Sequence, residues 1–156
     1  MHFPIAFTTA AVGFIAVGVL FRNWNHAAQC LMTGRWMLWA AALFALIAAL
    51  FGWFAFTSVA HDEVSHAAMI LHRNWAMAAL TALLALAARD VWRGRSGKQP
   101  SPGFVVLLAA AWLLAISTAW HGAELVYRHG LGVMSLPAAP IQLHPHANEH
   151  LHTPLA

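Results

Sequence analysis

The sequence predicts an all-α membrane protein, a bundle of four transmembrane helices with both termini on the outer side of the membrane. The 156 residues are 61% hydrophobic and only 8% charged, whereas about a quarter of the residues in a soluble domain are charged. Long apolar segments alternate with short polar ones along the chain. Lys and Arg concentrate in two of the polar segments, which indicates the orientation of the helices.

Each apolar segment is close to the length of about 20 residues that crosses a bilayer. Pro4 suits the start of the first span, because its missing N–H costs nothing in the first turn of a helix. A segment rich in Gly, Pro and Ser, residues 93–103, predicts a turn between the last two spans. The expected spans are residues 4–21, 36–57, 67–88 and 104–127.

After Gly130 the helical pattern ends and prolines become frequent. We therefore expect a transmembrane domain over residues 1–134 and a His- and Pro-rich outer tail over residues 135–156. The single cysteine, Cys30, excludes an intrachain disulfide and a Cys-based zinc or iron–sulfur site. The first residues lack a basic segment, so the first span is expected to be retained and not cleaved as a signal peptide.

The basic residues predict which side of the membrane each loop occupies. Arg22 and Arg35 lie in the first expected loop. Four more basic residues lie in the third expected loop or at its edge, namely Arg89, Arg93, Arg95 and Lys98. The opposite side carries only Arg73 and Arg128. The positive-inside rule places the two basic loops in the cytoplasm of a bacterium, in a multi-pass inner-membrane protein with periplasmic termini. The sequence pI near 10 then reflects topology. The bilayer is the expected partner, and nucleic acid is not.

Histidines concentrate on the predicted outer side. Of the 11 histidines, His26 alone falls on the inner side. Neutral imidazole is a common ligand of metals and of haem iron. The others are His2, His61, His66, His72, His121, His129, His144, His146, His150 and His152. This distribution predicts a histidine-lined site at the outer face.

His72 and His121 are the leading candidates because their expected depths match. From the expected span ends they lie roughly 8 Å and roughly 9 Å below the outer boundary. An ionisable side chain at such depth is costly unless it faces the bundle interior and has a partner. Haem iron held between two imidazoles from facing helices would be such a partner, so we expect a b-type haem.

Neighbouring side chains suit the same cofactor. Arg73 and Arg128 are the nearest cations for haem propionates, and Trp75 and Trp120 are placed to wall the porphyrin. The structural alternative is that such histidines only bond to carbonyl groups and that the tryptophans form an aromatic belt. The reserve ligands, for a second haem or a metal ion, are His2, His61, His66 and His129.

A copper or zinc site at the outer face is the alternative cofactor reading, because imidazole suits both metals. His121 and Glu124 are three residues apart and share a helix face, and His2 can supply a third ligand. The tail histidines would act as a weak collector. Glu124 can instead pair with Arg128, four residues further along the helix.

Two segments resemble a known family. They are His2-Phe3-Pro4-Ile5-Ala6 and Gly122-Ala123-Glu124-Leu125-Val126-Tyr127-Arg128-His129-Gly130-Leu131-Gly132-Val133. With four spans of this length, residues 2–134 resemble the bacterial membrane family catalogued as domain of unknown function 2231. Gly52, Trp53 and His72 fit its general pattern, and Ala123 replaces a second glycine that the pattern has before the Glu.

The resemblance implies an electron-transfer role, because members occur beside or fused to Rieske or cytochrome c domains, although the family has no established reaction. Its pattern singles out five positions, namely His2, His72, Glu124, Arg128 and His129.

The predicted function is therefore a membrane-embedded b-type haem protein, a candidate electron-transfer or oxidoreductase subunit. It would pass electrons at the periplasmic face to or from quinol, a periplasmic redox protein or a larger membrane complex. No histidine lies deep in the inner half, which favours local transfer at the outer face. No catalytic residue is assigned. The alternatives are the copper or zinc protein and a cofactor-free structural subunit of a membrane complex.

Overall fold

A computed structural model describes residues 2–58, 63–128 and 130 of the chain, and these residues form four helices and no strand. The helices are α1 (His2–Leu20), α2 (Ala27–Ser58), α3 (Glu63–Arg95) and α4 (Pro102–Tyr127). All four are long and apolar enough to cross a membrane. The prediction of an all-helical protein with four membrane-spanning helices is confirmed, while the side on which the termini lie stays a prediction.

The helices extend beyond the apolar spans expected from the sequence. The basic residue Arg35 lies inside α2, and Arg89, Arg93 and Arg95 lie inside α3. Backbone hydrogen bonds, which charged side chains do not prevent, set the length of a helix, whereas hydropathy sets only the part that can sit in lipid. The first loop is consequently a short turn, closed by bonds from Trp24 N to Phe21 O and from Ala27 N to Trp24 O.

The turn between α3 and α4 has the local chemistry expected of a helix end and a helix start. Gly97 has φ of 67°, the left-handed conformation that favours glycine after a helix. Ser101 caps α4 by accepting a hydrogen bond from Phe104 N at 3.3 Å. Pro102 follows it in the first turn, where its missing N–H is tolerated.

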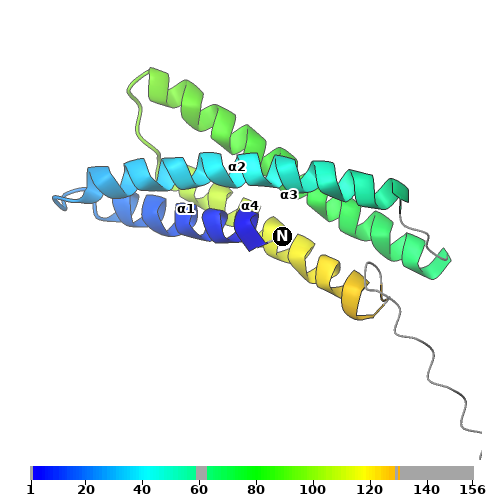
Figure 1. The fold of residues 1–156 in the computed structure, drawn as a ribbon. Coiled ribbons are helices and arrows are strands. Elements are labelled where there is room, and N and C mark those ends of the chain that lie inside the picture. The colour runs from blue at the N-terminus through cyan, green and yellow to red at the C-terminus, as the bar shows by residue number, and fades with distance from the viewer. Residues whose placement is uncertain (1, 59–62, 129, 131–156) are drawn as a thin grey trace, which may run out of the picture.

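The helices run alternately up and down and pack in a ring, α1 on α2, α2 on α3, α3 on α4 and α4 on α1. His2, Ser58, Glu63 and Tyr127 therefore mark one end of the bundle, which we call the histidine end. Leu20, Ala27, Arg95 and Pro102 mark the other, which we call the arginine end (Figure 1). Packing between α1 and α2 is especially close, because a Cβ on Gly34 would lie 2.9 Å from Ile15 N.

The large buried side chains lie in the half of the bundle next to the arginine end. Ile15, Leu38, Leu83 and Leu108 are each at most 1% exposed and belong to one cluster drawn from all four helices. Many other large apolar side chains are exposed on the surface of the bundle, for example Trp36, Trp92 and Trp120. Such an apolar exterior is what a helix bundle presents to lipid, so the protein contacts the bilayer.

Candidate functional site

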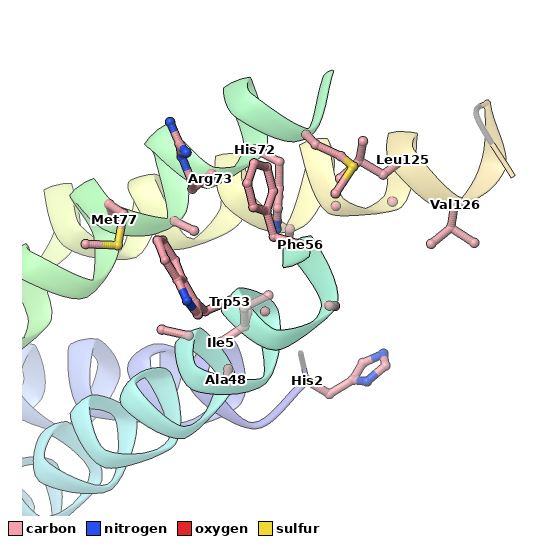
Figure 2. A pocket seen from close by; sticks show the side chains of 18 residues that line it. His2, Ile5, Ala48, Trp53, Phe56, His72, Arg73, Met77, Leu125 and Val126 are labelled. Carbon is pink, nitrogen blue, oxygen red and sulfur yellow. The ribbon is translucent and has the colours of Figure 1, made fainter. Parts of the chain in front are cut away.

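A cavity of about 560 Å³ lies between the four helices in the half next to the histidine end (Figure 2). Small residues on facing helices create the space, among them Ala49, Gly52, Ala76, Ala119 and Gly122. Larger apolar side chains complete the wall. Three ionisable side chains also line it, namely His2, His72 and Arg73.

His72 lies on α3 at the wall of the cavity and is held by α4 (Figure 2). Its Nδ1 is 3.1 Å from the backbone oxygen of Thr118. Because a carbonyl oxygen only accepts, Nδ1 must donate, and in the neutral ring the lone pair is then on Nε2. Nε2 makes no hydrogen bond to any described residue. A backbone carbonyl that fixes one imidazole nitrogen and leaves the other available is typical of a histidine that binds a metal.

Gly122 gives His72 its place against α4. A Cβ at position 122 would lie 3.1 Å from Cε1 of His72, closer than ordinary van der Waals contact. Thr118, one turn earlier on α4, is 7% exposed and turns its own hydroxyl to the Leu114 oxygen at 2.8 Å. The imidazole is therefore held by the Thr118 carbonyl on one turn of α4. It fits closely against the next turn because Gly122 has no side chain.

Arg73 and two aromatic residues of α2 form another part of the cavity wall. The guanidinium carbon of Arg73 lies 5.3 Å from the centre of the Phe56 ring. Trp53 also lines the cavity, although 63% of it is exposed at the surface of the bundle. Figure 2 shows Trp53 between α2 and α3, with Met77 beside it. Arg73 is thus the cation available to a ligand in the cavity.

His2 is the second histidine at the cavity. It is exposed at the start of α1, and in Figure 2 its ring points away from the other lining side chains. Its position at the rim, on the helix that packs against both α2 and α4, leaves the ring room to turn.

His121 lies on α4, near enough to His72 for the two imidazoles to interact electrostatically. Its ring stacks on Trp75 of α3 with centroids 5.8 Å apart, and it is not among the residues that line the cavity. Its Nδ1 is buried, lies 3.6 Å from Glu124 Oε2 and makes no hydrogen bond among the described residues. The pairing of His72 with His121 around one cofactor therefore stays a prediction. The second histidine that lines the cavity with His72 is His2.

Trp75, Trp120 and Arg128 also lie outside the cavity wall. Trp120 is 73% exposed and faces outward, and Trp75 is occupied by the stacking contact with His121. Arg128 forms the expected i,i+4 pair with Glu124, with 2.8 Å between Nη1 and Oε1. Of the two arginines predicted for propionates, the structure places Arg73 at the cavity and Arg128 at a helix-end ion pair.

The cavity lies within the part of the chain that a family model covers. The model described as "Predicted membrane protein (DUF2231)" matches residues 1–135. The chain belongs to this family. No curated protein and no solved structure matches it. Membership confirms the resemblance found in the sequence and describes a membrane protein, without naming a reaction.

Among the other predicted ligands of this DUF2231 protein, the described residue His66 is not part of the cavity lining. His66 is exposed near the start of α3, with its ring 6.0 Å from the Phe56 ring. Within residues 2–58 and 63–128, no three His, Cys, Asp or Glu side chains come close enough to hold a metal ion. The other predicted histidines lie outside the described residues, namely His61, His129, His144, His146, His150 and His152.

The sequence analysis missed Asp90, the most buried charged residue of the described DUF2231 structure. It is 5% exposed and accepts hydrogen bonds from Arg35 Nε at 2.9 Å and Trp39 Nε1 at 3.1 Å. These bonds join α2 to α3 near the arginine end. Asp90 is an isolated acid among basic residues at the end of an apolar span, and this pattern could have identified it as one half of an ion pair.

Proposed function

We propose that this DUF2231 protein binds a b-type haem in the cavity at the histidine end and passes electrons there. The observation that carries the proposal is His72. It lies at the wall of an apolar cavity, its Nδ1 donates to a backbone carbonyl, and its Nε2 is left without a hydrogen bond among the described residues.

The cavity fits a large, mainly apolar ligand with an acidic edge. Its volume of about 560 Å³ falls in the range of roughly 300–1,000 Å³ that cofactor pockets occupy. Arg73 supplies a cation for a carboxylate at the same wall, and Phe56 and Trp53 supply flat apolar surface. When bound, haem would supply one-electron redox chemistry.

The residues around His72 prepare it as a ligand. The Thr118 carbonyl orients the ring and increases the basicity of Nε2, as hydrogen bonds to the non-ligating nitrogen do at metal sites. The small side chains of α2 and α4 leave space beside it, and the apolar wall excludes water. We propose His2 as the second ligand because it lines the same cavity. His121, which the sequence favoured, is the competing candidate.

The visible spectrum of the purified protein tests the proposal. We expect a Soret band and, after reduction with dithionite, the sharp α and β bands of a six-coordinate b haem. His72→Ala should remove these bands or leave a five-coordinate spectrum. His26→Ala is the matched control, because His26 is exposed at the arginine end, where its ring bonds to Gln29 and packs against Trp24. Colourless protein from a haem-sufficient host would contradict the proposal.

Two further variants identify the second ligand. If His2 ligates, His2→Ala should give a five-coordinate spectrum and His121→Ala should leave the spectrum unchanged. The opposite result would restore the pair that the sequence favoured. Neither substitution is expected to prevent insertion, because each makes its helix more apolar.

A quinol site is the second candidate for the same cavity. With its proton on Nδ1, His72 presents Nε2 as a hydrogen-bond acceptor, which suits the hydroxyl of a quinol, and the apolar wall suits its tail. Colourless protein that carries extractable quinone, and loses it on His72→Ala, would support this alternative over the haem.

We also propose that the protein lies in the bacterial inner membrane with the histidine end facing the periplasm. The basic residues at the arginine end support this orientation by the positive-inside rule. A C-terminal reporter that is active only in the periplasm should be active in the fusion. Activity of a cytoplasmic reporter instead would place the cavity at the inner face.

A further inference from the structure

We propose that the arginine end carries a second binding site, which holds the phosphate group of an anionic lipid. Arg89 and Arg93 of α3 and Lys98 of the following turn form it. The site is at the opposite end of the bundle from the haem cavity, and the proposal does not depend on the haem. The two proposals therefore stand or fall separately.

The three cations line one small depression between the end of α3 and the start of α4. Asp90, Ser101 and Phe104 also line it. Its volume of about 10 Å³ accommodates roughly one water-sized group. The depression can therefore take one anionic oxygen, while the rest of a lipid headgroup stays at the surface beside Arg93 and Lys98.

Arg89 lacks a hydrogen-bond acceptor at this place. Its Nη1 is buried and has no hydrogen-bond partner among the described residues. The guanidinium carbon lies 5.6 Å from the centre of the Phe104 ring, so the group is held over an apolar surface. A buried guanidinium N–H without an acceptor is costly, because it has lost water and gained nothing in exchange. An anionic oxygen in the depression would satisfy it.

The site also has an uncompensated positive charge. The nearby acid, Asp90, is already engaged by Arg35 and by Trp39. Across residues 2–58 and 63–128, no carboxylate forms an ion pair with Arg89, Arg93 or Lys98. Three cations around one depression therefore lack a counter-ion from the described chain.

The position of the cations favours lipid phosphate as that counter-ion. They stand at the ends of two membrane-spanning helices, at the level where headgroups lie. Arginine presents paired N–H groups that match phosphate oxygens. The positive-inside rule also explains cations at this end, but that rule depends only on the number of positive charges on one side of the membrane. It does not explain why Arg89 Nη1 is buried without an acceptor among the described residues, and this is the feature that points to a ligand.

Native mass spectrometry and titration of the full chain in phosphatidylcholine nanodiscs can test the site, with phosphatidylglycerol as the probe. We expect the wild-type protein to bind phosphatidylglycerol in preference to phosphatidylcholine. Arg89→Gln and Arg93→Gln should each weaken that preference about five-fold, the effect expected of one basic residue at a membrane surface. Lys98→Gln should act in the same direction.

Arg95→Gln is the matched control. It removes the same charge from the same end of α3, but Arg95 is exposed and does not line the depression. An equal loss in Arg95→Gln would overturn the proposal, because charge alone would then explain the binding. If Arg89→Gln does not fold, Arg89→Lys and the other two variants still test the site, and unchanged preference in all of them would overturn it.

Inorganic phosphate separates the two sources of the same chemical group. Failure of millimolar phosphate to displace the lipid supports a lipid headgroup as the occupant. Displacement that depends on Arg89 and Arg93 would confirm a phosphate site but assign it to a soluble anion. Equal binding of both lipids, with no effect of phosphate, would overturn the proposal.

Discussion

The two halves of this bundle are built from similar helices but are packed in opposite ways. Next to the arginine end, large side chains such as Leu38 and Leu108 fill the space between the helices. Next to the histidine end, Ala and Gly occupy the facing positions and leave a cavity of about 560 Å³. We therefore expect the half next to the arginine end to contribute more of the stability, while the other half leaves space that a ligand could fill.

The polar side chains of the two halves also differ, because those near the arginine end mostly bond to one another and His72 at the cavity does not use both of its nitrogens within the described chain. Asp90 satisfies Arg35 and Trp39 by direct bonds near the arginine end, whereas His72 keeps a nitrogen available at the cavity. Arg89 is the exception at the arginine end, because its Nη1 has no described partner. Polar groups that satisfy one another hold the helices together, and those that do not indicate places where another molecule can bind.

The largest expected effect on stability is at Asp90. Asp90→Ala should lower the free energy of unfolding by about 4 kcal/mol, because it leaves the Arg35 guanidinium without its buried partner. Glu124→Ala, at the histidine end, removes an exposed pair with Arg128 and should cost less than about 1 kcal/mol. Unfolding in mixed micelles, followed by circular dichroism, measures both. Equal losses would show that the two ends do not differ in this way.

A pair of leucines on α4 tests the packing difference directly. Leu108 is 0% exposed in the core cluster, so Leu108→Ala should cost about 3 kcal/mol through lost contacts and a new cavity. Leu125 already borders the existing cavity, and Leu125→Ala should cost clearly less. The same unfolding assay applies. A larger loss at Leu125 would mean that the cavity half is as tightly packed as the core.

Gly122 offers a smaller and more specific test of the cavity. A Cβ at Gly122 would press on the His72 ring, whereas one at Gly13, which does not line the cavity, would meet nothing within 4 Å. Gly122→Ala should therefore shift the bands or the reduction potential of a haem bound in the cavity, and Gly13→Ala should not. Potentiometric titration of the two variants checks this. Identical titrations of both variants and the wild type would remove His72 from the ligand set.

The smallest effect is expected from the tail. Every described residue that lines the cavity lies at or before Val126. Deletion of residues 135–156 should leave the spectrum and the stoichiometry of haem unchanged, and pyridine haemochrome analysis can measure both. Loss of haem from the truncated protein alone would move the site to the tail and make the bundle its scaffold.

Hydropathy and charge were sufficient to predict the four helices and, among the described residues, the position of His2, His66, His72 and His121 toward one end of the bundle. The ends of α2 and α3 could not be predicted in this way, because a helix continues through charged residues such as Arg35 as long as its backbone bonds continue. The short turn at residues 21–26 therefore replaced the longer loop that the sequence suggested.

Counting residues from the expected span ends predicted similar depths for His72 and His121. It could not predict which way each side chain faces, because that depends on the rotation of each helix about its axis. In the structure His72 faces the cavity and His121 stacks on Trp75. The cavity itself depends on small residues such as Ala76 and Ala119, which look like ordinary membrane-helix residues in the sequence. Only their alignment across four helices makes them the wall of a cavity, and alignment is a property of the tertiary structure.

The origin of the cavity wall in all four helices has a consequence for how the protein is made. The lining begins with His2 in α1, the first of these four helices to be synthesised, and ends with Val126 in α4. The wall is therefore incomplete until α4 has entered the membrane beside α1 and α3. Any molecule that requires the whole wall must load after translation of the bundle, into an inserted protein, and cannot serve as a template for the insertion of the early helices.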